Sequence, residues 1–553
     1  MRSASPLLAG KLRFGATTLL VAAVAFAAGA SACAGCQKPA STEESAPQVD
    51  MNKPTARLFL VSSVAGALEP CGCTKSQLGG VDHLGAIVAA DTTPHLVVAA
   101  GPLLFMEPEL KGDHATQDRW KADAIADAAK NLGLVAWAPG ANDFAAGAAD
   151  LAKMAAEAGA KIVAGNLTSP DKLAVATLVK EVGGLKIGLV GVSDPKRRDG
   201  GYPDGVKAEP AAEAMKRGVA AVKAEGARVL VGLAALPRGE ALRLADLVPE
   251  LHVLAVGKPV EAGDTNDAPK PPILAGTTLV VETSNHLQTV AEVDLYARPG
   301  KGGAPLVFAD AGGVSKADEL LSLSGRIHEL EVRLESWSHD KGVKPEDVAA
   351  RKADLEKLKA DKVKLEAPPA APAGSFFRYT LVELKQDLAR DPKIAADMLK
   401  YYERVDEHNK TAFADRVPPP VEKDKAGYIG VEACTECHDD ARKVWDKTPH
   451  AGAYGTLAKQ HKAYNLDCVS CHVTGYGKPG GSTVTHNEKL QNVQCEECHG
   501  PGSLHAKDPK KKDAIIAKPS TDGCVSACHH PPHVESFDAK EKVKLILGKG
   551  HGM

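Results

Sequence analysis

The chain has 553 residues, with 67 Lys and Arg against 70 Asp and Glu, so its formal net charge is −3. This balance excludes a nucleic-acid partner bound by bulk electrostatics, because no cationic excess is available to neutralise phosphates. A composition of 44% apolar and 25% charged residues is typical of a globular protein and excludes a disordered or fibrous one.

Residues 1–32 have the organisation of a signal peptide. A basic start is followed by an apolar stretch at 14–29 and by three small residues at 30–32, directly before Cys33. The apolar stretch is short for a bilayer span, which takes about 20 residues. No later segment is apolar enough to cross a membrane. We therefore expect an exported protein in the periplasm or the outer cell envelope.

Cys33 is the expected site of lipid attachment. A cysteine after a run of small residues resembles the signal of a bacterial lipoprotein, in which that cysteine is acylated and becomes the first mature residue. Ordinary cleavage after Ala32 is the alternative, and Cys36 is a second candidate for the lipid. The polar segment 33–54 then predicts a tether between the membrane and the folded part.

Residues 55–314 alternate short β-rich runs with Ala-rich amphipathic stretches. The predicted strands are 57–64, 95–100, 134–138, 161–165, 186–192, 228–233 and 252–256. Between them lie helical stretches such as 119–132 and 145–158, with apolar residues spaced by three and four. Strand and helix alternation of this kind predicts an α/β layered domain.

Residues 315–415 have a different pattern. Leucines at helical spacing on a charged background, interrupted at 342–345, predict an antiparallel helical hairpin over 315–366. One more strand at 376–384 and a helix at 392–413 follow. The Pro-rich segment 416–426 predicts a linker and a domain boundary.

The final region, 427–553, contains 8 of the 12 cysteines and 11 of the 19 histidines. Its cysteines form four pairs, each followed at once by histidine. The four motifs are Cys434/Cys437/His438, Cys468/Cys471/His472, Cys495/Cys498/His499 and Cys524/Cys528/His529. This is the attachment signal for c-type haem, in which two thiols add to the vinyl groups and the histidine binds the iron. Zinc knuckles or disulfides would leave the four histidines unexplained. We therefore expect four covalent haems.

Each haem that only carries electrons commonly takes a second axial ligand. Seven further histidines are available for that role: His450, His461, His486, His505, His530, His533 and His551. Met553 is the only methionine of the region, so bis-histidine ligation is expected.

Three stretches of this region, 443–451, 467–481 and 493–505, resemble the nitrifier-type tetrahaem cytochrome c family well beyond the cysteine motifs. The resemblance implies a mostly helical and irregular multihaem domain, with His450 and His505 as distal ligands. It also places another such ligand near His551. A member of this family can keep one five-coordinate haem, here on His472.

The 57–299 region resembles the calcineurin-like metallophosphoesterase and 5′-nucleotidase family, through framework segments such as 65–73, 97–102, 138–144 and 186–191. That family holds two metal ions with Asp and His ligands that activate water and bind phosphate. The matching positions here are Ser63, Val64, Ala65, Gly101, Pro102, Gly140, Ala141, Asn142, Ala235 and Lys258. The ligand set is thus lost, and Asp143 alone cannot hold a two-metal centre. The resemblance therefore implies an inactive sandwich that acts as scaffold or partner-binding module.

Cys71 and Cys73 are the only cysteines between the tether and the haem motifs. In an exported protein such a pair forms a disulfide, binds a soft metal or acts as a redox dithiol. The sequence leaves these alternatives open.

Together these features favour an electron-transfer protein over an enzyme. Its expected partners are redox donor and acceptor proteins of the cell envelope, with the membrane reached through the lipid. Two enzymatic alternatives remain: a haem enzyme that reduces a small nitrogen or sulfur oxide, and a residual phosphoesterase.

Overall fold

The computed structural model describes residues 53–70, 77–169, 172–197, 199–261, 264–298, 306–338, 342–530, 534 and 537–551. The predicted signal peptide, Cys33, Cys36, the Cys71/Cys73 pair, His533 and Met553 lie outside these residues. Within them, no helix combines the length and apolar character of a membrane span.

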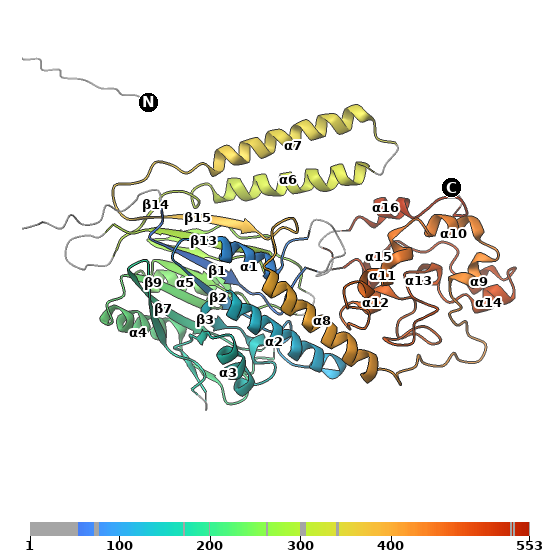
Figure 1. Cartoon of the computed structure of the whole chain (residues 1–553), viewed down its shortest axis with the longest axis horizontal. Coiled ribbons are helices and arrows are strands. Elements are labelled where there is room, and N and C mark those ends of the chain that lie inside the picture. Colours follow the sequence, from blue (N-terminus) through green and yellow to red (C-terminus); the bar gives the residue numbers. More distant parts are fainter. Residues whose placement is uncertain are drawn as a thin grey trace, which may run out of the picture. The chain divides into compact units, whose positions relative to one another are not determined.

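The first sheet has seven strands in the order β14-β15-β13-β1-β2-β3-β4 (Figure 1). Their bounds are β1 Ala56–Ser62, β2 His95–Gly101, β3 Leu134–Pro139, β4 Lys161–Ile162, β13 Thr289–Tyr296, β14 Ala309–Asp310 and β15 Phe376–Glu383. Strands β1 to β4 are parallel, whereas β13 is antiparallel to both of its neighbours. Arg57 on β1 donates from Nε to Asp294 Oδ1 on β13 at 2.6 Å, which pairs the charges of these adjacent strands.

The second sheet has six strands in the order β11-β12-β10-β9-β7-β6. Their bounds are β6 Thr177–Val182, β7 Leu185–Ser193, β9 Val229–Ala235, β10 Val253–Val256, β11 Ile273–Ala275 and β12 Thr278–Val281. The central strands β7, β9, β10 and β12 are parallel, and the edge strands β6 and β11 are antiparallel to them. A separate short pair joins β5 (Leu167–Thr168) to β8 (Lys207–Ala208).

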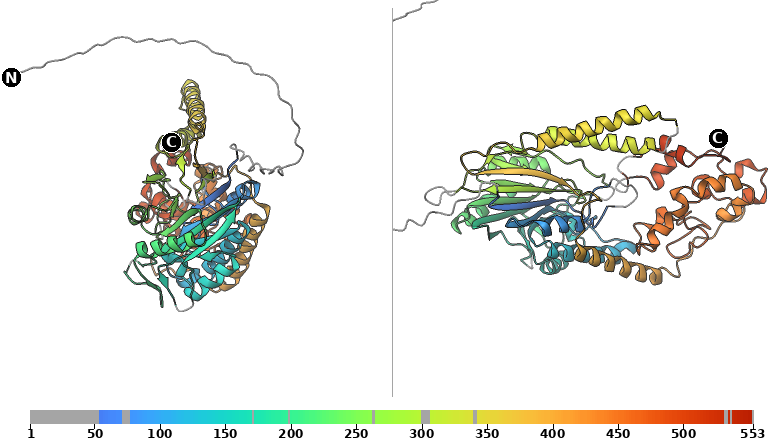
Figure 2. Two further views of the ribbon diagram at one scale, coloured as in Figure 1. Left: turned by 90° about the vertical axis from the view of Figure 1, so that its left-hand side faces the viewer. Right: turned by 45° about the horizontal axis from the view of Figure 1, so that its top comes forward.

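The two sheets face each other, and helices cover their outer faces (Figures 1 and 2). Side chains alternate along β1: Leu58 and Leu60 point into the core between the sheets, while Phe59 belongs to the core beneath the helices of the first sheet. Those helices are α1 Val81–Ala90, α2 Ala115–Asn131, α3 Ala148–Glu157 and α8 Pro392–Ala412, and the second sheet carries α4 Ala211–Ala224 and α5 Arg238–Leu247. Short 3-10 turns occur at η1 Gly112–His114 and η2 Ala141–Phe144. The predicted α/β layered sandwich is confirmed.

The predicted hairpin consists of α6 (Ala317–Ser338) and α7 (Pro345–Glu366), which run side by side (Figure 2). Its core is small and contains Leu323, Ile327 and Leu355. The chain then returns through β15 to the first sheet and continues into α8.

The C-terminal region consists of short helices joined by irregular segments, as predicted. The α-helices are α9 Val431–Thr435, α10 Asp439–Trp445, α11 Ala453–Ala458, α12 Val469–His472, α13 Cys495–His499, α14 Ser503–Lys507, α15 Asp522–Ala527 and α16 Ala539–Lys542. The 3-10 turns are η3 Pro449–Gly452, η4 Lys512–Ala514 and η5 Val543–Leu545. Its small apolar core contains Tyr454, Leu466, Val469, Val473 and Val484.

The segment that follows α8 is bound to this C-terminal region. Phe413, directly after the helix, is buried in the same apolar core. The backbone N–H of Gly480 donates to the carbonyl of Pro419 at 2.8 Å, and the Thr483 hydroxyl donates to the carbonyl of Arg416 at 2.8 Å. The Pro-rich stretch is therefore anchored at several points along its length.

Candidate haem-binding site

The cysteine and histidine motifs lie on short helical turns. In the first motif the N–H of His438 donates to the carbonyl of Cys434 at 3.0 Å. In the fourth, the N–H of His529 donates to the carbonyl of Cys524 at 2.9 Å, despite the extra residue between its cysteines. These hydrogen bonds keep each histidine within one helical turn of the first cysteine of its motif. Such a turn is what attachment of one haem by two thiols and one imidazole requires.

Two motif histidines have one ring nitrogen fixed by the backbone. His472 Nδ1 lies 2.6 Å from the carbonyl of Ala453, and His499 Nδ1 lies 2.7 Å from the carbonyl of Ile516. Because a carbonyl only accepts, Nδ1 carries the hydrogen and Nε2 keeps its lone pair for a metal. Burial also lowers the pKa of His472 and so favours the neutral ring.

Thiols of different motifs lie close together. Cys434 of the first motif neighbours Cys495 of the third, Cys471 of the second neighbours Cys528 of the fourth, and Cys498 of the third is near Cys524 of the fourth. The neighbouring thiol lowers the pKa of Cys495 and that of Cys471, against the effect of burial. The chain thus brings the first motif beside the third and the second beside the fourth.

Cys437, the second cysteine of the first motif, is placed differently from most of the others. Cys437 and Cys498 are exposed, whereas the other six motif cysteines are partly buried. None of these thiol pairs includes Cys437, although its backbone N–H donates to the carbonyl of Cys434 at 3.3 Å and so belongs to the turn of the motif. Cys437 follows the end of α9 at Thr435 and lies on the surface. The structure therefore does not enclose this predicted attachment residue, and its thioether bond stays a prediction of the motif.

Two further histidines face motif histidines. The ring centres of His438 and His505 are 6.3 Å apart, as are those of His450 and His529. A metal held between two imidazoles separates their centres by about 6 Å, given bonds of about 2 Å to nitrogen and about 1 Å from each nitrogen to its ring centre. Within the described residues, the buried Nδ1 of His505 has no hydrogen-bond partner. Both ring pairs therefore have the spacing of bis-histidine ligation.

The other histidines have different surroundings. Burial lowers the pKa of His551, and the charges of His499 and His438 lower it further. His551 is therefore near the histidines of the third and first motifs. His461 is exposed at 3.9 Å from Glu403, and His486 Nδ1 lies 3.1 Å from the hydroxyl of Thr485.

Glu496 is a structural residue that sequence reasoning missed. It lies between the cysteines of the third motif, and only 1% of its surface is exposed. Its carboxylate accepts from the backbone N–H groups of Ile429, Gly430 and Gly502. Gly502, shortly after the motif, is a weak signal for such a carboxylate, whereas Gly430 lies 66 positions before Glu496 and no local pattern points to it. Glu496 thereby fixes the third motif to the start of the region.

These residues fit covalently bound haem. The eight motif cysteines form no disulfide with one another, which leaves their sulfurs available for thioether bonds. Neutral imidazoles with a fixed Nδ1 hydrogen are the donors that haem iron takes in c-type cytochromes.

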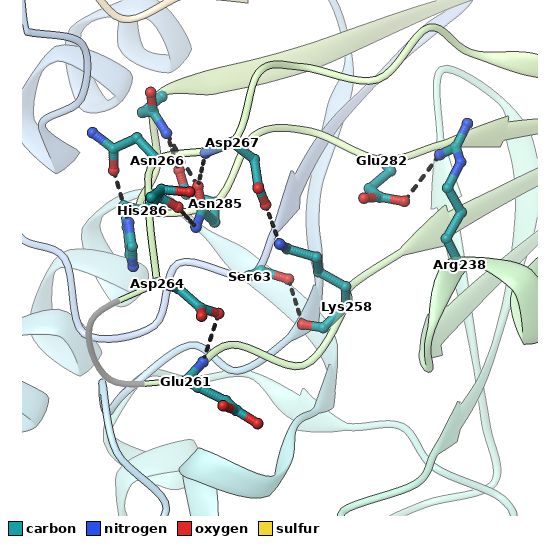
Figure 3. Close-up of polar contacts among 12 residues, drawn as sticks. Ser63, Arg238, Lys258, Glu261, Asp264, Asn266, Asp267, Glu282, Asn285 and His286 are labelled. Atoms are coloured by element: carbon teal, nitrogen blue, oxygen red, sulfur yellow. Dashed lines mark hydrogen bonds and ion pairs between the residues drawn. The ribbon is translucent and has the colours of Figure 1, made fainter. Parts of the chain in front are cut away.

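Two of the positions predicted to correspond to phosphoesterase ligands, Ser63 and Lys258, lie side by side (Figure 3). The Ser63 hydroxyl donates to the carbonyl of Lys258 at 2.8 Å, and the Lys258 ammonium is paired with Asp267. A Cβ added to Gly101 would lie 2.8 Å from the Ser63 hydroxyl. These three predicted ligand positions thus carry a hydroxyl, a glycine and an internal ion pair.

Asp143, the remaining carboxylate at this centre, is bound to the backbone. It is fully buried and accepts from the N–H groups of Leu103 and Leu104 at 2.8 Å and of Gly140 at 2.9 Å. Burial raises its pKa to about 6, against the opposing effect of these hydrogen bonds. The three hydrogen bonds use both carboxylate oxygens, so Asp143 connects the segment after β2 to the segment after β3.

The part of the chain that the structure describes contains one cluster of three His, Cys, Asp or Glu side chains with ligand atoms close enough for a single metal. That cluster is His114, Asp118 and Asp467, and it lies outside the phosphoesterase-like centre.

Comparison with known proteins supports the cytochrome assignment. Residues 433–500 match the family described as cytochrome c554 and c-prime. The chain is 36% identical over 109 residues to cytochrome c-554 of Nitrosomonas europaea, a match that covers 17% of this chain and 46% of the relative. The chain therefore spans a little under half of that protein's length. Over these residues the C-terminal region is similar to a c-type cytochrome, a class that binds haem covalently.

Solved structures similar to the chain are mainly those of 5′-nucleotidases and related hydrolases. The 5′-nucleotidase precursor of Thermus thermophilus is 17% identical with a TM-score of 0.42, over 73% of this chain and 67% of that one. The sulfate thiohydrolase SoxB of Thermus thermophilus is 12% identical with a TM-score of 0.41, over 64% of this chain and 61% of that one.

Proposed function

We propose that this chain, whose C-terminal region is similar to a c-type cytochrome, carries four covalent haems and passes single electrons in the cell envelope. The grouping of the motifs carries the proposal. The support is that the thiols of the first and third motifs are neighbours, as are those of the second and fourth. Motifs in this arrangement would place the haems of each pair next to one another, which suits stepwise transfer of electrons.

The proposed ligands follow from the ring pairs. His438 and His505 would bind one iron, and His450 and His529 a second, because each pair has centres 6.3 Å apart. His551 is the candidate for the distal side of His499. Paired imidazoles favour low reduction potentials compared with histidine and methionine.

We further propose that the N-terminal sandwich is not a phosphoesterase and serves as scaffold or partner-binding module. The support is the replacement of metal ligands by Ser63, Gly101 and the Lys258–Asp267 ion pair. A signal peptide at 1–32 and a lipid on Cys33 would place the protein in the periplasm or outer envelope, within reach of redox donor and acceptor proteins.

The number of haems is tested by the mass of the mature protein. We expect an increase of four haem masses over the polypeptide, together with the absorbance of a c-type cytochrome. A mass that corresponds to three haems would show that Cys524 and Cys528, with their extra intervening residue, are not used. A polypeptide without haem would refute the proposed function.

One observation favours a second candidate, a haem enzyme that reduces a small nitrogen or sulfur oxide. No ring pair among the described residues includes His472, whose Nδ1 is held by Ala453. An iron bound by His472 alone would leave one side open to a ligand. A high-spin component in the spectrum that changes on addition of nitric oxide or sulfite would support this candidate, whereas entirely low-spin haem would support the electron carrier.

A further inference from the structure

The second haem motif is preceded by a loop that contacts the N-terminal sandwich. Asp467, the residue directly before Cys468, accepts a hydrogen bond from Lys121 Nζ of α2, with 2.6 Å between Nζ and Oδ2. On its other oxygen, Asp467 Oδ1 lies 3.5 Å from Nδ1 of His114, just before α2. The side chains of Lys121 and Asp467 are 21% and 32% exposed, so both are partly buried.

A buried neutral network fixes the same loop. Gln117, one turn before Lys121 on α2, accepts through Oε1 from the N–H of Leu466 at 3.0 Å and from Asn409 Nδ2 of α8 at 3.1 Å. Its Nε2 donates to Asn465 Oδ1 at 3.3 Å. At most 2% of the surface of each of these three amide side chains is exposed. Because buried amides tolerate little misalignment, Lys121 and Asp467 are held in one geometry.

A second ion pair lies on the other side of the loop. Lys462 is paired with Glu69, which follows β1 in the sandwich, and its ammonium lies 4.3 Å from the ring centre of Tyr402 on α8. The loop 462–467 is therefore attached to the sandwich through both ends.

The positive charge beside Asp467 is the ammonium group of Lys121. His114, Asp118 and Asp467 have the spacing of a three-ligand metal site. However, Lys121 already donates to Asp467 at 2.6 Å, and a metal ion there would be repelled by the ammonium. The cluster is thus an ion-pair network between the sandwich and the second motif.

The network keeps a charge beside a haem attachment cysteine. Although partial burial raises it, the pKa of Asp467 is held well below its usual value by the charge of Lys121 and the hydrogen bond from His114. Asp467 is therefore ionised at neutral pH. A negative charge next to a haem stabilises the ferric state, and a positive charge stabilises the ferrous state.

We propose that Lys121 is a positioning residue for electron transfer, through which the N-terminal sandwich sets the reduction potential of the haem bound at Cys468 and Cys471. The inference rests on the proposed function, since it needs a haem on the second motif. It deepens that function, because it makes the sandwich part of the environment of one haem.

The test is a spectroscopic redox titration of the full-length protein at pH 9, where an unpaired Asp467 stays ionised. In Lys121→Met, one haem should shift to a lower potential while the other haems keep theirs. In Asp467→Asn the same haem should shift to a higher potential. The double variant should return close to wild type, because both charges are absent. Lys121→Arg should restore the wild-type value, and Lys130→Met on the exposed face of α2 should change nothing.

If every haem has the same potential in Lys121→Met and in Asp467→Asn as it has in wild type, the proposal is overturned. If Lys121→Met does not fold, comparison of Asp467→Asn with the double variant isolates the effect of Lys121, and equal potentials there would overturn it as well. Absence of a haem mass on the peptide that contains Cys468 and Cys471 in wild type would instead refute the proposed function for this motif.

Discussion

His450 and His505 each follow one haem motif in the chain but face the histidine of another motif. His450 follows His438 in the chain but faces His529, and His505 follows His499 but faces His438. A motif histidine is held on its own haem by the adjacent thioether bonds, so a histidine close behind it reaches a neighbouring haem more easily. Such cross-ligation would connect distant parts of a region whose apolar core is small.

Replacement of either residue should therefore change one haem without releasing it. In His450→Ala and in His505→Ala we expect one haem to become high-spin and five-coordinate, with all haems still covalently attached. The absorbance spectrum and the electron paramagnetic resonance spectrum measure the spin state, and mass spectrometry measures attachment. His461→Ala is the matched control, because that ring is exposed beside Glu403. Unchanged low-spin spectra in both variants would show that these two residues are not ligands.

Asp143 should matter for stability. Its carboxylate satisfies three buried backbone N–H groups. Asp143→Ala leaves these groups unpaired, at a cost of about 1–3 kcal/mol for each group. We expect a loss of at least about 3 kcal/mol in the free energy of unfolding, measured by chemical denaturation.

Asp143→Asn provides the comparison, since its side-chain oxygen can still accept from Leu103 and Leu104 while its amide is placed against Gly140. We expect it to lose less stability than the alanine variant. Equal stability of Asp143→Ala and wild type would show that the hydrogen bonds make no net contribution.

The hairpin of α6 and α7 is an element with few ties to the rest of the sandwich. Its own core is limited to Leu323, Ile327 and Leu355 with partly buried leucines around them. The start and the end of the hairpin lie close together, where Lys316 Nζ donates to the carbonyl of Leu365 at 3.1 Å. The next strand in the chain, β15, belongs to the first sheet and pairs with β13 along eight residues.

Deletion of the hairpin should leave the fold intact. We expect a variant in which a short Gly-Ser linker replaces 317–364 to keep the haem content and the redox potentials of wild type. Its melting temperature should fall by only a few degrees, as expected for the loss of a small satellite core. A deletion of α8 is the contrasting variant, since that helix contributes Ile394, Met398 and Val405 to the main core. Loss of haem on removal of the hairpin would show that it supports the C-terminal region.

At the scale of the whole molecule, the proposal that the sandwich is not a phosphoesterase can be tested directly. We expect nucleotide and phosphodiester turnover with added manganese or zinc to equal that of a buffer blank. The physical reason is that Ser63, Gly101 and Lys258 offer no carboxylate or imidazole to a metal pair. Turnover that depends on added metal and co-purifies with the chain would contradict this expectation.

Much of the sandwich is predictable from local patterns. The predicted strand 95–100 is observed as β2 His95–Gly101, and the predicted helix 392–413 as α8 Pro392–Ala412. Strand β13 was not predicted, although it lies inside the first sheet, between β15 and β1. Its Glu292 and Asp294 interrupt the apolar pattern, and only the neighbouring strand β1 explains them, because Arg57 pairs with both.

The sequence by itself predicts which residues attach haem, since each motif is local: two thiols and a histidine close together in the chain. It also predicts the absence of the phosphoesterase ligands, because that prediction depends only on which residue types stand at the matching positions. Tertiary structure alone decides how the motifs are grouped, which imidazole faces which motif, and that Lys121 of the sandwich lies against Asp467 beside the second motif. These are contacts between residues far apart in the chain, up to 346 positions for Lys121 and Asp467, and no local spacing encodes them.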